Sequence, residues 1–514
     1  MEKSSNRTRS GPAFRLLVLT WYISYYSLYG ILKGRSMGVR KKGLYVISAS
    51  LLATLIYTSS CKEGEKPEKP NVLFITIDDL RDTDYDPQLK TPNIDHLAEE
   101  GMSFERTYAQ GTFSNPSRTS MLTGLRVTTT NVTDNRTPLQ DQLPNITTLP
   151  QVFHENGYHT FQIGKIFHGR DSHNDPQAWD KAIYPSGTSL GDKGEDRNLT
   201  DGKVRWCRWR MAEGTATDQA DGQIARQAVQ FLEGEHDKPF FLAVGFHKPH
   251  DPFVAPKKYF EMYPLEDIKL HKDPENYSPT LPEHLPDTHP WKEAFDKFDM
   301  KDKKEFLRAY YAGATFMDAQ LGKVLQKLAE TGLDDNTVIV LLSDHGYHLG
   351  EREWWNKSTL YEYSARAPLI VSTPEMEAKG RECSRILEFV DIYPTLLDLC
   401  GLNDPSHELA GRSFKSLLDD PEQSWKKSAY TEILHRSGRT GRTIRTENFR
   451  YIEWRSKSND DIISQELFDH REDPGEYHNL ADDPKYKSVL NRMKDSMDAY
   501  ISTVREKRKE LHED

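Results

Sequence analysis

The chain has 514 residues, of which 36% are hydrophobic and 29% are charged, so we expect two to three domains with the composition of a soluble globular enzyme. The formal net charge of −11 argues against a nucleic-acid partner. The chain has four cysteines, Cys61, Cys207, Cys383 and Cys400, which make no dense disulfide framework and show no CxxC metal spacing. We expect Cys383 and Cys400 to be buried free thiols, with a disulfide between them as the alternative.

Residues 1–61 have the pattern of a targeting region. Met37 begins a basic stretch, residues 44–57 are apolar, and small residues precede Cys61, as at a bacterial lipoprotein cleavage site. We therefore expect an exported protein that is lipid-anchored through Cys61 to the outer membrane, on the periplasmic or cell-surface side. Met37 is then a candidate for the true start, and residues 62–69 form a linker. A transmembrane anchor at residues 14–32 is the alternative, although Arg15 and several tyrosines make it a poor span.

The body of the chain alternates short apolar runs with amphipathic stretches. The apolar runs cover residues 71–77, 158–163, 240–246 and 338–342, and residues 305–330 have helical spacing. Continuous apolar runs are typical of strands buried on both faces. The pattern predicts an α/β fold with a mostly parallel central sheet.

Ionisable residues follow each of these runs. Because ligands bind at the carboxyl ends of strands in open α/β sheets, we expect these residues to share one site. They are Asp78 and Asp79, Lys165, His247, and Asp344 with His345.

Asp78, Asp79 and Asp344 are candidates for a hard-cation site. Carboxylates supply the oxygen ligands that Ca²⁺ prefers, so we expect one calcium ion here, with His345 beside the carboxylates. An imidazole is a poor calcium ligand, so His345 alternatively contacts the nucleophile or the bound anion. A helix cap or a solvated turn is the competing interpretation of the Asp78–Asp79 pair.

Residues 114–124 read Ser-Asn-Pro-Ser-Arg-Thr-Ser-Met-Leu-Thr-Gly. This stretch resembles the signature of the formylglycine-dependent sulfatases, which belong to the alkaline-phosphatase-like superfamily. In that family the first residue, here Ser114, is oxidised to formylglycine (3-oxoalanine), whose hydrated aldehyde is the nucleophile. A hydrated aldehyde beside a metal and a cation is a better nucleophile than a plain serine hydroxyl.

Several other stretches carry the same resemblance. Family landmarks include Asp95 in Thr-Pro-Asn-Ile-Asp-His-Leu-Ala and Asp391 in Asp-Ile-Tyr-Pro-Thr-Leu. Within the family the chain looks most like iduronate-2-sulfatase, through Gly-Lys-Ile-Phe-His at 164–168 and Phe-His-Lys-Pro-His at 246–250. The resemblance spans most of residues 68–485.

The resemblance implies a fold and roles for single residues. It implies a catalytic α/β/α sandwich over residues 70–410 and a smaller C-terminal α+β domain over 411–514, with an antiparallel sheet and a terminal helix. It also implies that His168 lies beside the nucleophile and that the modified Ser114 completes a metal site formed by Asp78, Asp79, Asp344 and His345. The implied sulfate-binding residues are Arg118, Lys165, His247 and Lys357.

Serine in place of cysteine at position 114 resembles the bacterial Ser-type class, which a radical-SAM maturase activates. The implied substrate is a sulfated oligosaccharide or polysaccharide carrying 2-O-sulfate, such as ulvan or a glycosaminoglycan. We expect the insert 170–213 to supply substrate loops, with Trp354 and Trp355 lining the pocket. Residues 435–442 add a basic loop.

Two alternatives remain open. One is a phosphonate monoester or phosphodiester hydrolase of the same superfamily. The other is a non-catalytic lipoprotein that binds sulfated glycans, in which Ser114 stays unmodified.

Overall fold

The structure is a computed structural model that describes residues 69–169, 173–275, 277, 289–374, 376–434 and 438–512. Residues Lys69–Asp514 form one compact unit. The predicted targeting region, the anchor at Cys61, the start at Met37 and all but the last residue of the linker lie outside the described residues. None of the described helices is both long and apolar enough to cross a membrane.

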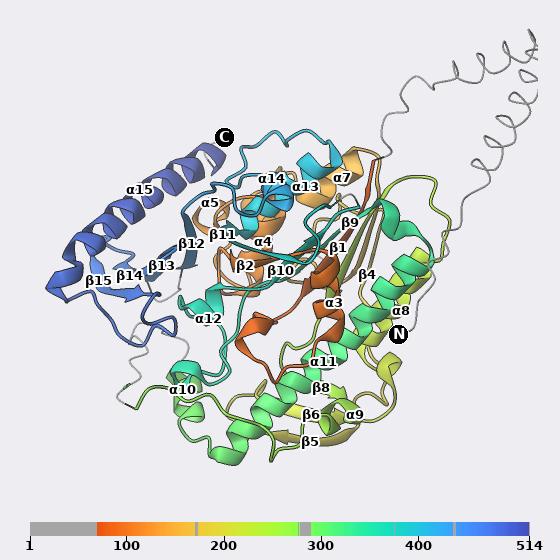
Figure 1. The fold of residues 1–514 in the computed structure, drawn as a ribbon, viewed down its shortest axis with the longest axis horizontal. Helices are drawn as coiled ribbons and strands as arrows, with labels where there is room; N and C mark the ends of the chain where they lie inside the picture. The colour runs from red at the N-terminus through yellow and green to blue at the C-terminus, as the bar shows by residue number, and fades with distance from the viewer. Residues whose placement is uncertain are drawn as a thin grey trace, which may run out of the picture. The chain divides into compact units, whose positions relative to one another are not determined.

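An eight-stranded sheet lies at the centre of this unit (Figure 1). Its strand order is β11-β2-β10-β9-β1-β7-β3-β4, and only β10 runs antiparallel to its neighbours. The four predicted strands are present within one residue at each end, which confirms the predicted α/β class. The strands are β1 (Asn71–Ile77), β2 (Met102–Tyr108), β3 (His159–Gly164), β4 (Lys181–Ile183), β7 (Phe240–Phe246), β9 (Thr337–Ser343), β10 (Leu369–Ser372) and β11 (Arg381–Glu388).

Helices cover both faces of this sheet because alternate strand residues point to opposite sides. Leu73 and Ile75 of β1 pack with one set of helices, and Val72 and Phe74 pack with the other. On the first face lie α3 (Pro92–Glu100), α8 (Ala220–Leu232) and α11 (Met300–Glu330). On the second face lie α4 (Ser114–Thr123), α6 (Leu139–Gln142), α7 (Leu149–Glu155), α13 (Ile392–Cys400) and α14 (Lys415–Asp419).

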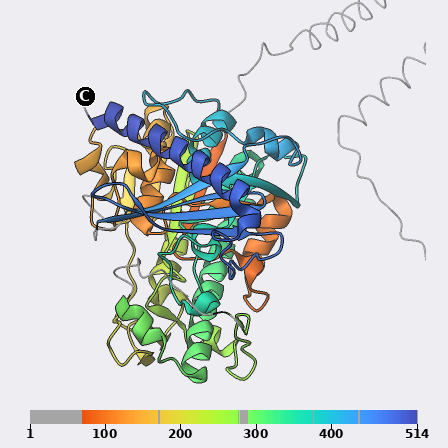
Figure 2. The same ribbon diagram turned by 90° about the vertical axis from the view of Figure 1, so that its left-hand side faces the viewer.

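The insert that we expected to form substrate loops contributes a second, three-stranded sheet with its own apolar cluster. It lies with α9, α10 and the start of α11 below the main sheet (Figure 2). Trp209, Trp354 and Trp355 are buried in this cluster, at 3%, 0% and 4% exposure, so the prediction that Trp354 and Trp355 line the pocket is wrong. The elements are β5 (Gly194–Asn198), β6 (Arg208–Ala212), β8 (Phe253–Pro256), α9 (Lys257–Glu261) and α10 (His289–Phe295).

A four-stranded antiparallel sheet and a long final helix close the chain, as predicted. Ile444, Tyr451 and Leu467 of the sheet pack against Met497 and Ile501 of the helix. The elements are β12 (Ser428–Leu434), β13 (Arg439–Thr446), β14 (Phe449–Ser456), β15 (Ile462–Asp469) and α15 (Lys487–His512).

Buried ion pairs join this sheet to the rest of the unit. Glu362 of α12 (Glu362–Ala365) accepts from Arg445 Nε at 3.1 Å and from Arg450. Glu476 also pairs with Arg450, and one of its oxygens accepts from the Glu362 backbone N–H at 2.8 Å. Removing one partner of such a buried network leaves an uncompensated charge, so these contacts hold the two sheets together.

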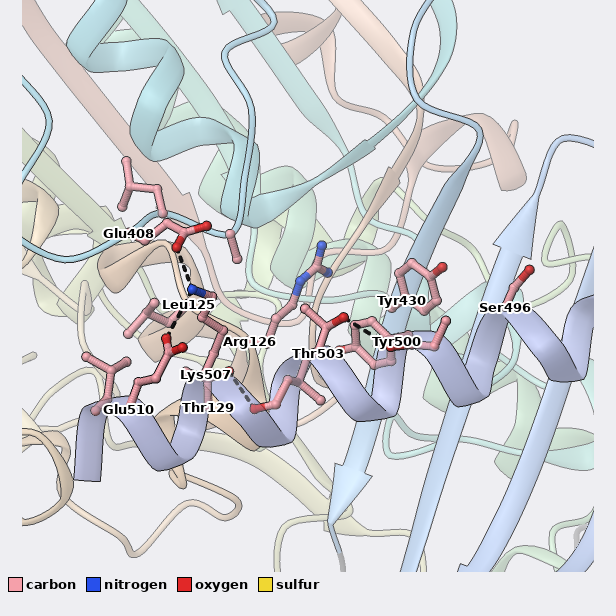
Figure 3. A pocket seen from close by; sticks show the side chains of 15 residues that line it. Leu125, Arg126, Thr129, Glu408, Tyr430, Ser496, Tyr500, Thr503, Lys507 and Glu510 are labelled. Atoms are coloured by element: carbon pink, nitrogen blue, oxygen red, sulfur yellow. Dashed lines mark hydrogen bonds and ion pairs between the residues drawn. The ribbon is translucent and has the colours of Figure 1, made fainter. Parts of the chain in front are cut away.

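A cavity of about 610 Å³ lies beside α15 and α5 (Val127–Thr130) (Figure 3). The rings of Tyr430 and Tyr500 stack at 4.0 Å along it, and the Arg126 guanidinium lies over both rings. No predicted site residue is among its lining residues.

Candidate active site

Ser114 is the first residue of α4, and its side chain is buried. Its Oγ lies 3.5 Å from Asp78 Oδ1 and 3.3 Å from His345 Nε2. The amino end of a helix carries a partial positive charge, which favours an anion bound beside Ser114. The helix ends at Gly124, whose φ of +68° suits a glycine at a C-terminal cap.

The three candidate carboxylates meet because β1 and β9 are paired in parallel and end together, with Ile77 opposite Ser343. Asp78 and Asp79 follow β1, Asp344 follows β9, and the Asp79 backbone N–H donates to Asp344 Oδ1 at 3.1 Å. All three are buried. The structure therefore brings together the residues that we predicted to hold a metal.

Asp79 has a left-handed backbone conformation, with φ of +67°. Such a conformation costs free energy for a residue other than glycine and needs support from its surroundings. Tyr310 of α11 supplies this support: its hydroxyl donates to the Asp79 carbonyl at 2.7 Å and accepts the Arg81 N–H at 2.8 Å. Asp79 Oδ2 is buried and has no hydrogen-bond partner among the described residues.

His345 presents a ring nitrogen to the same centre. Its Nδ1 lies 3.0 Å from the Gly346 carbonyl, which accepts the Nδ1 proton and leaves Nε2 with a lone pair. Nε2 lies 3.6 Å from both Asp79 Oδ1 and Asp344 Oδ2. Burial lowers the pKa of His345, which keeps the ring neutral. An orphaned carboxylate oxygen and a neutral imidazole beside further carboxylates fit a divalent cation.

Arg118 lies one turn along α4 from Ser114 and points at the carboxylates. Its Nε is 3.0 Å from Asp344 Oδ2, and its Nη2 is 3.2 Å from Asp78 Oδ1. Its Nη1 donates to the carbonyls of Lys165 and Ile166. None of the described hydrogen bonds of Arg118 goes to Ser114, and the guanidinium fixes the carboxylates in place.

Two lysines complete the charge balance. Lys165 Nζ lies 2.6 Å from Asp78 Oδ2, and Lys357 Nζ contacts Asp79 Oδ1. Burial alone would raise the pKa of Asp78, but Lys165 and its other basic neighbours hold that pKa well below its usual value. Burial alone would lower the pKa of Lys357, but Asp79 and the neighbouring carboxylates raise it. Asp78 and Lys357 are therefore charged near neutral pH.

The predicted site histidines after β3 and β7 lie in the same region. Burial, together with the nearby Lys165, lowers the pKa of His168 and of His247 to about 3. Both rings are therefore neutral at physiological pH. Lys165 is placed by Gly164, which has φ of +83° and where a Cβ atom would lie only 2.2 Å from the Gly245 carbonyl oxygen.

His250 is a site residue that the sequence analysis did not assign. Its Nε2 lies 3.8 Å from Asp79 Oδ2 and 4.0 Å from Asp78 Oδ2. The ring is partly exposed, so it lies on the open side of the two carboxylates. The only sequence signal was its place in the Phe-His-Lys-Pro-His stretch.

Asp221 is a second residue that the sequence analysis missed. It lies in the first turn of α8 and accepts the backbone N–H groups of His247 at 2.9 Å and Lys248 at 2.8 Å. Lys248 Nζ in turn donates to the carbonyls of His250 and Pro252. The buried carboxylate of Asp221 and the half-buried side chain of Lys248 thus clamp the loop that carries His247 and His250.

Comparisons with known proteins agree with this site. A family model described as sulfatase matches residues 70–402, and one described as N-sulphoglucosamine sulphohydrolase, C-terminal, matches residues 350–503. The chain is 32% identical to a sulfatase of Formosa agariphila over 85% of this chain and 89% of that protein. It is 30% identical to iduronate 2-sulfatase of Homo sapiens over 80% of this chain and 91% of that protein.

The fold is also shared with solved structures. One of them, described as in complex with its substrate D-glucosamine-2-N,6-O-disulfate, has a TM-score of 0.68 and 24% identity, and covers 85% of this chain and 99% of that chain. Fold and site together define a hydrolase of sulfuric esters. The chain belongs to the sulfatase family, whose members generally use formylglycine and a divalent metal, and the resemblance seen in the sequence is confirmed.

Proposed function

We propose that this sulfatase hydrolyses sulfate esters on a sulfated glycan, with Ser114 oxidised to formylglycine and one calcium ion bound. The observation that carries the proposal is the position of Ser114 Oγ, which lies at the amino end of α4 within 3.5 Å of Asp78 and 3.3 Å of His345. A nucleophile at this place attacks an anion that the helix end and nearby cations attract.

The charged side chains of the site divide into one set that would hold the cation and another that would bind the sulfate. Asp78, Asp79, Asp344 and His345 would hold the cation, which supplies Lewis-acid polarisation of a bound oxygen. Formylglycine supplies a more reactive oxygen nucleophile than serine.

The basic side chains would bind the sulfate. Lys165 and Lys357 now pair with the carboxylates of Asp78 and Asp79. A cation held by those carboxylates would offset their charge and leave both ammonium groups able to bind sulfate oxygens. The neutral ring of His168 can accept a proton from the nucleophile, and the protonated ammonium group of Lys357 can supply one to the leaving alcohol.

The proposed substrate is the 2-O-sulfate of a uronic acid in a glycosaminoglycan or in ulvan. Likeness to iduronate 2-sulfatase over 80% of the chain supports a sulfated sugar acid, and the fold neighbour with a bound disulfated glucosamine supports a sulfated sugar. We further propose that a radical-SAM maturase oxidises Ser114 and that the protein is exported and lipid-anchored at Cys61.

The test is sulfate release by protein co-produced with a Ser-type maturase. The panel holds 2-O-sulfated uronic acid disaccharides, ulvan and carrageenan oligomers, and a phosphate ester matched to each sulfate ester. We expect release from at least one sulfated sugar, and none from Ser114→Ala purified in the same way. Faster turnover of the phosphate esters would favour the phosphonate or phosphodiester alternative. Binding of sulfated sugars without turnover of any ester by matured protein would favour the non-catalytic alternative.

A further inference from the structure

A second cavity, of about 560 Å³, lies at the edge strand β11 of the central sheet. The strands β2, β10 and β9 separate β11 from β1, which carries Asp78 and Asp79. No candidate active-site residue is among its lining residues. The cavity at β11 is therefore separate from the active site.

The lining of this cavity is rich in positive charge. Only two carboxylates, Glu422 and Glu447, line it, in a chain whose formal net charge is −11. The five basic lining residues are Arg106, Arg385, Lys426, Lys427 and Arg492.

The pairing of these cations leaves part of the charge free. Lys426 lies 2.6 Å from both Glu388 and Asp391, which are buried and neutralise it. Lys427 and Arg492 are exposed and have no ion-pair partner within the part of the chain that the structure describes. Two free cations therefore face solvent at one cavity.

The remaining two basic residues pair with exposed carboxylates at the surface. Arg106 is 3.9 Å from Glu447, and Arg385 is 3.3 Å from the Glu422 carboxylate and also donates to the Glu422 carbonyl; both carboxylates are mostly exposed. Arg385 Nε is buried without a hydrogen-bond partner among the described atoms. An incoming anion can therefore compete for both arginines.

Rigid elements hold the cavity. The β11–β2 pairing shifts register between Cys383 and Ile386, and the consecutive residues Ser384, Arg385 and Ile386 all line the cavity. Such an irregularity re-aims side chains that would otherwise alternate between faces. The β13–β14 turn forms another wall and is braced by Arg445, whose Nη1 donates to the Glu447 carbonyl at 3.2 Å.

The cavity beside α15 differs from the cavity at β11 in the pairing of its basic side chains (Figure 3). There Lys507 lies between Glu408 and Glu510, and Arg126 is bound to Glu388, so its basic groups are already paired. Positive charge without a partner distinguishes the cavity at β11.

We propose that the cavity at β11 is a second, non-catalytic binding site for a sulfated polysaccharide chain. Its ligand is the polyanionic glycan itself, because regularly spaced sulfate groups can engage the unpaired Lys427 and Arg492 together and compete with exposed Glu422 for Arg385. Binding a chain here raises its concentration at the active site without changing the chemistry. The proposal rests on the proposed function, since it assumes a polymeric sulfated substrate.

The experiment compares the double variant Lys427→Ser/Arg492→Ser with wild type. Binding of a heparin octasaccharide is measured by calorimetry at low and high salt, and turnover is measured on a sulfated disaccharide that the wild type hydrolyses. We expect the octasaccharide Kd to rise by about tenfold at low salt, with the difference shrinking at high salt. We expect kcat/KM on the disaccharide to stay within about twofold, because the short substrate does not reach the cavity.

The matched control is Arg508→Ser/Lys509→Ser, which removes the same charge from α15, the helix that carries Arg492, at positions outside the cavity. It should bind the octasaccharide as wild type does. Unchanged binding by the Lys427/Arg492 variant, or an equal loss in the control, would overturn the proposal. Because binding is measured without turnover, a wild-type protein that binds the octasaccharide but releases no sulfate would contradict only the proposed function.

Discussion

At the residue scale, the surroundings of Ser114 are a balanced set of charges. Basic side chains contact all three carboxylates of Asp78, Asp79 and Asp344, and among these carboxylate oxygens only Asp79 Oδ2 has no hydrogen bond to the described residues. Burying so many charges is costly unless each finds a partner. Retaining them at one edge of the sheet is therefore a sign of function and not of stability.

Tyr310 is predicted to set the affinity for the cation through Asp79. Tyr310→Phe keeps the ring but removes the hydroxyl that donates to the Asp79 carbonyl at 2.7 Å. Because residues that orient metal ligands typically contribute 10–100-fold to affinity, we expect Ca²⁺ to bind about tenfold more weakly. Calorimetric titration of the metal-free protein with Ca²⁺ measures this.

Tyr311→Phe is the matched control for this prediction. Tyr311 is also buried on α11, but its hydroxyl donates to Asp86, away from the carboxylates of the site. It should leave Ca²⁺ affinity unchanged. Equal affinities for wild type and Tyr310→Phe would contradict the role given to Tyr310.

The sequence predicted which residues gather at the site but not which residues support them. Asp78, Lys165, His247 and Asp344 follow apolar runs, so the end of each strand identified them. Tyr310 lies within a long helix, and its contact with Asp79 depends on tertiary packing that no local pattern reveals. The same packing buries Trp354, where we expected a pocket wall.

At the scale of single elements, a side chain of α8 holds the loop after β7 in its conformation. Asp221 accepts two consecutive backbone N–H groups, of His247 and Lys248, and Lys248 Nζ binds two carbonyls further along. An irregular loop is rigid when its backbone groups are all satisfied in this way. The loop can therefore present His247 and His250 in fixed positions.

Asp221→Asn is predicted to loosen this loop. An amide has one acceptor oxygen, so its NH₂ group would face a backbone N–H that it cannot satisfy. We expect kcat/KM on the sulfated disaccharide to fall by about tenfold or more, because small displacements of positioning groups are costly in catalysis. Steady-state kinetics of matured protein checks this.

Glu233→Gln serves as the control at the other end of α8, where Glu233 pairs with Lys327 at the surface. Its kinetics should match the wild type. If Asp221→Asn retained full activity, the clamp would have no part in placing the histidines.

The central strands could be predicted from sequence, whereas the small sheet of the insert could not. Strands such as β1 are buried on both faces and read as continuous apolar runs. Strand β5 has the sequence Gly-Glu-Asp-Arg-Asn and pairs mainly through its backbone, so its side chains give no strand signal. Its existence follows from pairing with β6.

At the scale of the whole molecule, buried ions tie the C-terminal sheet to the catalytic region. Burial alone would raise the pKa of Glu476, but Arg450 and His470 outweigh it and lower the pKa to about 2. A carboxyl whose pKa is lower in the folded state stabilises the fold above its unfolded pKa, near 4.5. That stabilisation is lost as the pH falls from about 4.5 towards 2.

The free energy of unfolding is therefore predicted to fall steeply below pH 4.5. Glu476→Gln should cost about 3 kcal/mol at pH 7, because it leaves part of the Arg450 charge uncompensated. The variant should also lose less stability than wild type between pH 4.5 and 3. Urea unfolding at several pH values measures both effects.

Glu472→Gln, an exposed substitution nearby, should change the free energy of unfolding by less than about 0.5 kcal/mol. If the free energy of unfolding depended on pH in the same way in wild type and in Glu476→Gln, the pair of Glu476 with Arg450 would not link folding to pH.

The central claim is that oxidised Ser114 is the nucleophile of this sulfatase, and mass spectrometry of the peptide that contains it tests the claim most directly. Protein samples produced with graded amounts of a Ser-type maturase are each assayed for sulfate release. We predict that release rises in proportion to the fraction of the peptide that has lost two hydrogen atoms, and that it is absent where Ser114 is unmodified. Equal release by unmodified and oxidised protein would contradict the account.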